Sequence, residues 1–129
     1  YHSSLRENLS YGLEKDVPDT ELLNVAKQFK LFNEKENYDL DKNISNKTLS
    51  SGQMQKISFI RSLLSEVDIL LLDESTSNLD QDTKKLIFNI LSSKNLTIIN
   101  STHSPDEFKG YDNHIKIEIK DEMRYLDFI

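Results

Sequence analysis

Hydrophobic residues recur every three to four positions in three stretches of this chain, and that spacing predicts three amphipathic helices. Two other stretches are short continuous aliphatic runs, which are typical of strands buried in a parallel sheet. The predicted helices cover residues 19–29, 52–66 and 80–91, and the predicted strands cover residues 69–72 and 96–100. Helices followed by alternating strands and helices predict an α/β fold.

Polar residues mark where each predicted helix begins. Asp19 follows a Val-Pro pair and is the expected N-cap of the first helix. Ser50, with Gln53 three residues later, matches the capping-box pattern ahead of the second helix. Asp80 is the expected cap of the third helix, and Ser104-Pro105 predicts a further helix start after the second strand.

Three other segments have weaker or different patterns. Isoleucines at 115, 117 and 119 alternate with charged residues and are followed by residues 123–128, which predicts an antiparallel hairpin at the end of the chain. The polar segment 33–47 predicts a short helix followed by a surface loop. Residues 1–12 show no cap and no leading strand, and we interpret them as the continuation of a longer structure.

The composition of the chain excludes several classes of function. The formal charge of −6 and the lack of a dense Lys/Arg cluster argue against nucleic-acid binding. No apolar run approaches the roughly 20 residues that span a bilayer, so we expect no direct membrane insertion by this segment. The absence of cysteine excludes disulfides, zinc-thiolate sites and thiol nucleophiles.

Two adjacent acids, Asp73 and Glu74, directly follow the first predicted strand. A buried aliphatic strand tolerates a carboxylate only at its end, where the carboxylate meets a cation or water. Asp73 is therefore well placed to hold Mg²⁺ through its water shell. Glu74 would point in another direction, where it would orient or deprotonate an attacking water. Structurally, such a pair also suits a cap of the following turn.

The helix start at Ser50, Ser51, Gly52 and Gln53 presents free backbone N–H groups and the positive end of a helix dipole. Gly52 would let a phosphate approach the backbone without a Cβ in the way. Taken alone, such a start is usually only a cap. His103 follows the second predicted strand, at the rim where parallel sheets place ligands, although a solitary histidine is more often structural.

The order of these features resembles the ATP-binding cassette family. The segment LSSGQ at 49–53 resembles the ABC signature, ILLLDE at 69–74 resembles Walker B with the catalytic glutamate, and SNLD at 77–80 resembles the D-loop. His103 matches the switch histidine of the family. Two positions depart from the family pattern, since Ser51 stands where glycine is usual and Asn78 where alanine is commoner.

The resemblance implies ATP and Mg²⁺ as cofactors and a role for each matched residue. Asp73 would support Mg²⁺, Glu74 would act as general base, and His103 would contact the γ-phosphate. Asp80 would help to hold a second ATP-binding cassette. The signature residues Ser50, Ser51, Gly52 and Gln53 would close over the ATP of that opposite cassette.

The segment RENL at 6–9 resembles the part of exporter-type cassettes that faces the coupling helices of the transmembrane domains. The resemblance therefore implies ATP hydrolysis that drives export and a place on the cytoplasmic side of the membrane. The implied fold is a partial P-loop NTPase-like α/β fold. Residues 1–66 would form the helical signature subdomain, and residues 67–129 would form the C-terminal half of a RecA-like core.

None of the three glycines, at 12, 52 and 110, precedes the Lys-Ser or Lys-Thr pair of a Walker A turn. We therefore expect this segment to begin just after the Q-loop of a cassette and to be inactive by itself. We also expect its strands to leave a sheet edge and an apolar face uncovered. Two alternatives stay open: the C-terminal lobe of a structural-maintenance or DNA-repair ATPase, and a non-catalytic interaction module.

Overall fold

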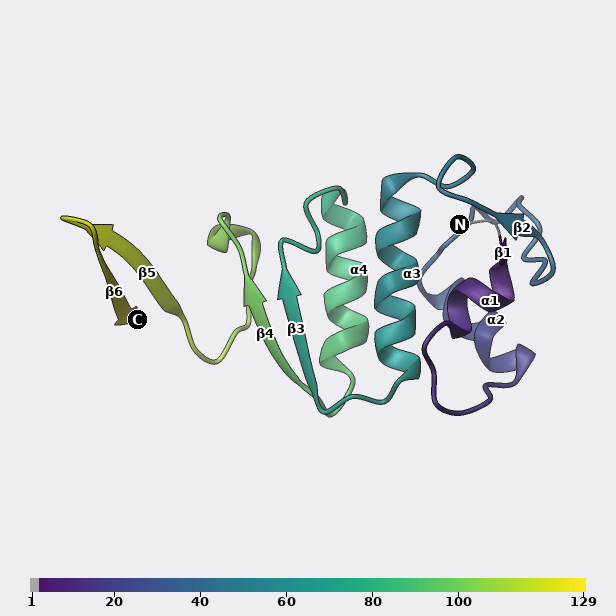
Figure 1. Ribbon diagram of the computed structural model, residues 1–129, viewed down its shortest axis with the longest axis horizontal. Coiled ribbons are helices and arrows are strands. Elements are labelled where there is room, and N and C mark those ends of the chain that lie inside the picture. The colour runs from purple at the N-terminus through teal and green to yellow at the C-terminus, as the bar shows by residue number, and fades with distance from the viewer. Residues whose placement is uncertain (1–2) are drawn as a thin grey trace.

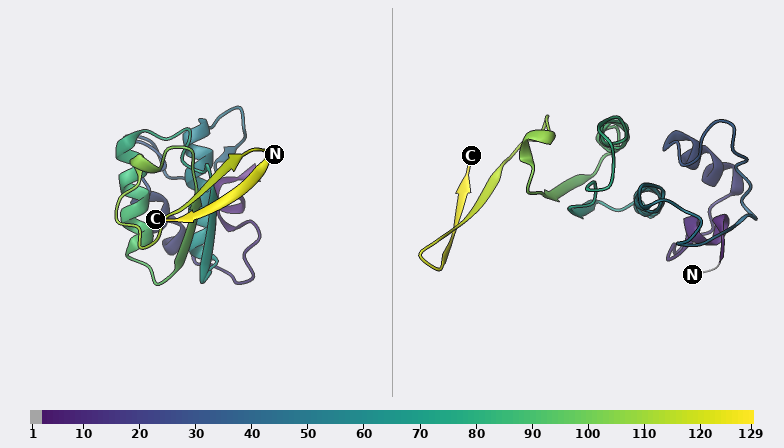
Figure 2. Two further views of the ribbon diagram at one scale, coloured as in Figure 1. Left: turned by 90° about the vertical axis from the view of Figure 1, so that its left-hand side faces the viewer. Right: turned by 90° about the horizontal axis from the view of Figure 1, so that it is seen from above.

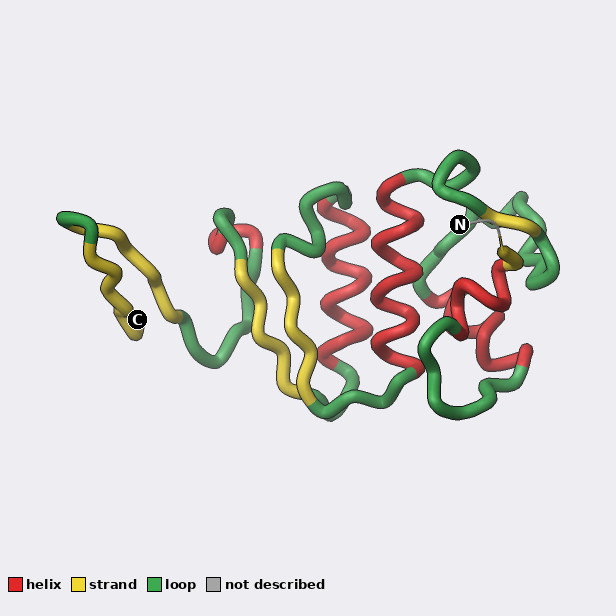
Figure 3. Tube along the Cα trace, viewed as in Figure 1, coloured by secondary structure: helices red, strands yellow, loops and turns green. Residues whose placement is uncertain are grey.

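A computed structural model describes residues 3–129 of the chain. Figure 3 shows the helices and strands along the chain. The α-helices are α1 (Leu5–Ser10), α2 (Asp19–Gln28), α3 (Ser51–Leu64) and α4 (Gln81–Ser92), and η1 (Pro105–Glu107) is a short 3₁₀ helix. The strands are β1 (Ser3–Ser4), β2 (Asn43–Ile44), β3 (Ile69–Asp73), β4 (Thr97–Ser101), β5 (Ile115–Lys120) and β6 (Met123–Phe128). The three predicted amphipathic helices are confirmed.

Helices α1, α2 and α3 pack together at one end of the molecule (Figure 1). Their contact is hydrophobic, since the inward side chains of all three helices are almost inaccessible to solvent. Its most deeply buried members include Leu5, Leu9, Leu22, Phe29 and Ile60. The same buried cluster continues without a break into α4 and β3.

Strands β3 and β4 pair in parallel, with Ile69 opposite Thr97 and Asp73 opposite Ser101. Helix α4 connects them and covers one face of the pair, as the view from above in Figure 2 shows. Leu70 and Leu72 are buried and belong to the same hydrophobic cluster as the inward residues of α3 and α4. On the other face Leu71 is 71% exposed, together with Ile69 and Ile99. The expected uncovered apolar face is therefore confirmed.

Strands β5 and β6 form the predicted antiparallel hairpin, which extends away from the helices (Figures 1 and 2). The register places three isoleucines of β5 opposite Phe128, Leu126 and Arg124 of β6. The apolar side chains of these pairs are exposed. The hairpin completes the α/β arrangement expected from the sequence, with helices first and strands mainly in the second half.

Two local expectations were wrong. The N-cap of α2 is Pro18 and not Asp19, which is the first residue of the helix. The short helix expected within residues 33–47 is absent from this described segment, which contains turns and β2. The Tyr38 hydroxyl accepts a hydrogen bond from Phe32 N and donates one to Phe32 O, while Asp39 Oδ1 accepts one from Asp41 N. These local bonds compete with helix formation.

The expectation that residues 1–12 contain neither a cap nor a leading strand was also wrong, since β1 precedes the first helix and pairs with β2, and the helix has a cap. The structure describes this part of the chain from Ser3 onward, and residues 1 and 2 lie outside the described residues. Ser4 Oγ accepts a hydrogen bond from Glu7 N, and Ser4 N donates one to Glu7 Oε2. Ser4 and Glu7 thus form a capping box, the same motif that begins α3. Within residues 3–129, no helix has the length and hydrophobicity needed to cross a membrane.

Arg6 joins three segments of the helical end. Its guanidinium donates to both carboxylate oxygens of Asp19, at 3.0 and 2.9 Å, and pairs with Asp41 on a third segment. This double hydrogen bond lowers the pKa of Asp19 below its usual value. The charged form of Asp19 is therefore favoured by folding, and this contribution to stability is present above the unfolded pKa of Asp19.

We predict that Asp19→Asn lowers the melting temperature at pH 7 and that the difference from wild type shrinks as the pH falls below about 4. The reason is that protonation of Asp19 removes the same interaction from the wild-type protein. Thermal unfolding followed by circular dichroism between pH 7 and pH 3 measures this difference. Asp16→Asn, an exposed acid three residues earlier, is the matched control. A destabilisation that is equal at pH 7 and pH 3 would contradict the assignment.

Candidate functional site

The residues singled out from the sequence lie along one edge of the molecule. Helices α3 and α4 begin at this edge, and the parallel strands β3 and β4 end there (Figure 1). Helix N-termini carry partial positive charge and free N–H groups, whereas the strand ends here carry two acids. The edge therefore combines donors for an anion with carboxylates for a cation.

The start of α3 is organised by its own side chains. Gln53 N donates to Ser50 Oγ at 3.1 Å, and Ser50 N donates to Gln53 Oε1 at 2.9 Å, which confirms the predicted capping box. Gln53 Nε2 also donates to the carbonyl of Leu31 at 3.3 Å. The side chain of Gln53 thus forms hydrogen bonds within the fold, while Ser51 is exposed to solvent.

Gly52 packs against the turn that follows β3. A methyl group placed on its Cα would lie 3.6 Å from Leu79 Cδ2 and 3.7 Å from the carbonyl oxygen of Asn78. Both distances are ordinary van der Waals contacts. The chain itself therefore has room for alanine at position 52, and the LSSGQ segment and the SNLD turn form one continuous surface.

The end of β3 places its two acids differently. Asp73 is the last residue of the strand, opposite Ser101, and is exposed. Glu74 has a left-handed backbone with φ of 50°, and its N–H donates to the carbonyl of Ser101 at 3.1 Å. A glutamate in this conformation carries strain, which is common at functional sites. The sequence predicted an acid at position 74 but not its left-handed backbone conformation.

Glu74 and His103 meet at this edge. The backbone N–H of His103 donates to Glu74 Oε1 at 2.7 Å, and His103 Nε2 lies 3.8 Å from the same oxygen. The imidazole is 96% exposed, so the backbone of His103 is fixed while its ring is open to solvent. Sequence reasoning selected these residues separately, and the structure brings them together.

Asp73 suits one part of a magnesium site. Mg²⁺ usually takes one or two protein carboxylates, several waters and substrate phosphate oxygens. An exposed carboxylate at a strand end fits such a ligand. Across residues 3–129 no group of three His, Cys, Asp or Glu side chains gathers to hold a metal. The remaining ligands would have to be water and phosphate.

Asp80 begins α4 and is confirmed as its N-cap. Its Oδ1 accepts a hydrogen bond from Thr83 N at 2.7 Å. This bond to the Thr83 backbone lowers the pKa of Asp80, with a smaller contribution from the positive charge of Lys56. The charged cap fixes the end of the SNLD turn to the first turn of α4.

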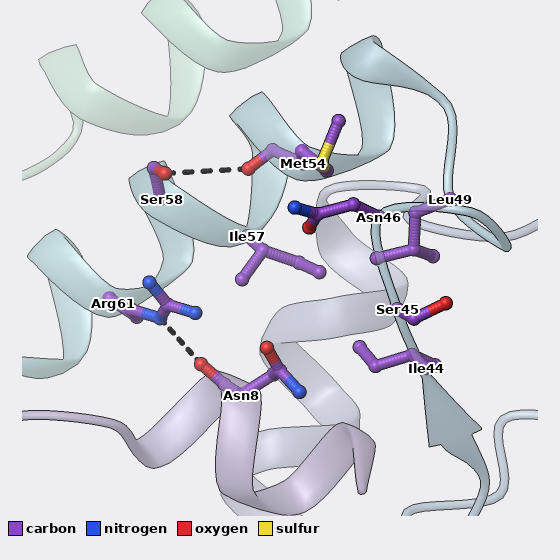
Figure 4. A pocket seen from close by; sticks show the side chains of 9 residues that line it. All are labelled: Asn8, Ile44, Ser45, Asn46, Leu49, Met54, Ile57, Ser58 and Arg61. Atoms are coloured by element: carbon purple, nitrogen blue, oxygen red, sulfur yellow. Dashed lines mark hydrogen bonds between the residues drawn. The ribbon is translucent and has the colours of Figure 1, made fainter. Parts of the chain in front are cut away.

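A hollow of about 170 Å³ lies beside α3, away from the acids (Figure 4). Arg61 Nε donates to the backbone carbonyl of Asn8, and burial lowers the pKa of Arg61. Sequence reasoning selected Asn8, and Leu49 as part of the LSSGQ segment, but it missed the other lining residues, because they come from separate segments that no local pattern connects. The missed lining residues are Ile44, Ser45, Asn46, Met54, Ile57, Ser58 and Arg61.

Comparison with known proteins gives consistent matches. The profile of the family described as "ABC transporter" matches residues 1–77. The ATP-dependent lipid A-core flippase of Pseudoalteromonas translucida is 32% identical, and the match covers 98% of this chain and 24% of the flippase. The sublancin-168-processing and transport ATP-binding protein of Bacillus subtilis is 35% identical over 84% of this chain and 16% of its own length.

A solved structure of a bacterial Atm1-family ABC exporter with ATP bound resembles this fold with a TM-score of 0.68. The two sequences are 25% identical, and the match covers 78% of this chain and 18% of the exporter chain. The chain thus spans about a quarter or less of the length of these proteins. The match supports the predicted partial P-loop NTPase-like fold.

The left-handed backbone at Glu74 makes a direct prediction. Glu74→Gly and Glu74→Ala both remove the carboxylate, but only alanine keeps a Cβ in the strained conformation. We predict that Glu74→Gly is more stable than Glu74→Ala by about 1 kcal/mol. Urea unfolding of both variants measures the difference. At Asn24, an exposed position in the middle of α2, which serves as the control, alanine should instead be more stable than glycine by about 1 kcal/mol. The same order at both positions would contradict the interpretation.

Proposed function

Since this chain belongs to the ABC transporter family, we propose that it forms part of the nucleotide-binding domain of an exporter-type transporter that hydrolyses ATP. The observation that carries the proposal is the meeting of Glu74 with His103 at the edge where both parallel strands end. The flippase, the sublancin transporter and the exporter are all named as transport proteins, and these names support the proposal that this chain belongs to a transporter.

Each residue at the edge has a chemical role in this proposal. Glu74 is the general base, because its carboxylate lies at the strand end and remains half-exposed to water. His103 contacts the γ-phosphate, because its ring is open while its backbone is fixed. Asp73 holds Mg²⁺ through water. When bound, the metal neutralises charge on the phosphate oxygens.

A second cassette is the proposed partner at the start of α3. Ser50, Ser51 and Gly52 face solvent or lie only half-buried at a helix N-terminus, which suits the phosphates of ATP held by another chain. Gln53 supports this surface indirectly, since both ends of its amide are bonded within the fold. Asp80 lies on the same surface and would contact the partner cassette.

The coupling helices of a transmembrane domain are the proposed partner at the hollow beside α3. Of the RENL segment, Leu9 is buried and Arg6 is bonded to two acids, so Asn8 is the residue that borders an open recess. The recess is lined by both polar and apolar groups, as a site for an amphipathic helix end requires. This arrangement would place the chain on the cytoplasmic side of the membrane.

Within these 129 residues no glycine-rich turn ends in Lys-Ser or Lys-Thr. We therefore predict that the purified 129-residue chain has no measurable Mg²⁺-dependent ATP hydrolysis, because it lacks the groups that cradle the β- and γ-phosphates. A coupled assay of phosphate release measures this activity. Saturable turnover that disappears in Glu74→Gln would overturn the prediction.

In the complete protein that contains this sequence, we predict that Glu74→Gln lowers ATP hydrolysis about 100-fold or more while ATP binding persists, since the amide cannot accept a proton from water. Phosphate release and equilibrium binding of a fluorescent ATP analogue measure the two effects. The control is Glu66→Gln. Glu66 follows the C-terminal end of α3, at the end opposite to the signature residues, and pairs with Lys15. Unchanged hydrolysis in Glu74→Gln would exclude Glu74 as the base.

A further inference from the structure

The least exposed ion pair among the described residues joins α4 to the turn after β4. Lys84 Nζ lies 2.6 Å from Glu107 Oε2, and the Lys84 side chain is only 12% exposed. A cation so far removed from water needs a partner, and removal of that partner is costly. This contact therefore constrains the turn more than an ordinary surface ion pair does.

An aromatic contact lies beside the ion pair. The rings of Phe88 and Phe108 meet edge to face, with centroids 5.1 Å apart and an angle of 81°. Lys84 and Phe88 are four residues apart on one face of α4, whereas Glu107 and Phe108 are consecutive. Two side chains of α4, Lys84 and Phe88, thus contact two adjacent residues of the turn, Glu107 and Phe108. We name these four residues the α4 clamp.

The clamped turn has few other supports. It contains η1, which spans only Pro105–Glu107 and has no side-chain cap. Its internal backbone bonds run from Glu107 N to Ser104 O and from Phe108 N to Pro105 O, both at 3.1 Å. One turn of 3₁₀ helix is weak by itself. The clamp is therefore a major fixed point between β4 and the hairpin.

His103 directly precedes this turn. Its position is fixed on one side by the pairing of Ser101 with Asp73 and on the other by the α4 clamp. Between these two supports, its backbone N–H donates to Glu74 Oε1 at 2.7 Å. Lys84 also belongs to the first turn of α4, where its N–H donates to the carbonyl of Asp80 at 3.0 Å. The SNLD turn and His103 thus share one rigid support.

We propose that Lys84 is a positioning residue that holds His103 against Glu74 by clamping the Glu107 turn to the start of α4. The proposal rests on the function proposed above, in which Glu74 and His103 act on ATP. It adds that a shift of the Asp80 turn, which a partner cassette would contact, is transmitted through Lys84 to His103. Lys84 and Glu107 are 23 residues apart in the sequence, and neither belongs to a motif discussed above.

The first test is amide hydrogen exchange in the 129-residue chain, followed by NMR. We expect Lys84→Met, which keeps most of the apolar stem, to raise the exchange rate of the His103 amide about tenfold and to leave the β4 amides unchanged. Glu107→Gln removes the same ion pair from its more exposed side and should act alike. The exchanged pair, Lys84→Glu with Glu107→Lys, should restore slow exchange. Lys85→Met, at an exposed neighbour, is the control.

The second test is ATP hydrolysis by the complete protein. We expect Lys84→Met and Glu107→Gln to lower kcat about tenfold with little change in KM, and the exchanged pair to recover most of kcat. An unchanged His103 exchange rate, an unchanged kcat, or failure of the exchanged pair to restore either would overturn the proposal. The proposed function fails separately, through unchanged hydrolysis in Glu74→Gln, and the exchange measurement does not depend on that result.

Discussion

The arrangement of this molecule depends on the parallel pairing of β3 with β4. A parallel pair requires a crossover, and α4 supplies it while covering Leu70 and Leu72. The register that places Asp73 opposite Ser101 also decides which residues emerge next from each strand. Glu74 follows the first strand at once and His103 follows the second after one residue. A slip of one position would separate the carboxylate from the amide that it binds.

Elements whose signals lie within a few residues could be predicted from the sequence. Ser50 with Gln53 and Asp80 cap their helices as expected, because a cap is decided by a side chain and an N–H three residues away. Segment 33–47 was misread, because its polar composition hides bonds such as that of Tyr38 to Phe32. The capping box of Ser4 and Glu7 was equally local, and its pattern was present in the sequence but overlooked.

The candidate site was predictable in its residue types and not in its geometry. Asp73, Glu74 and His103 stand out because each follows an aliphatic run, and the edge of a parallel sheet brings such positions together. The left-handed backbone of Glu74 has no signal in a sequence that places glutamate there. Likewise, the pairing of Lys84 with Glu107 depends on how α4 lies against a turn 23 residues away.

Gly52 is a position that the fold itself leaves free, whereas the proposed contact with a second cassette would restrict it. Its neighbours Leu79 and Asn78 leave ordinary contact distance for a methyl group, and alanine is favoured over glycine in helices by about 0.5 to 1 kcal/mol. A library of this chain displayed on phage and selected only for resistance to protease would therefore accumulate alanine at position 52. Such a consensus sequence would no longer contain the glycine that the proposed contact with a second cassette uses.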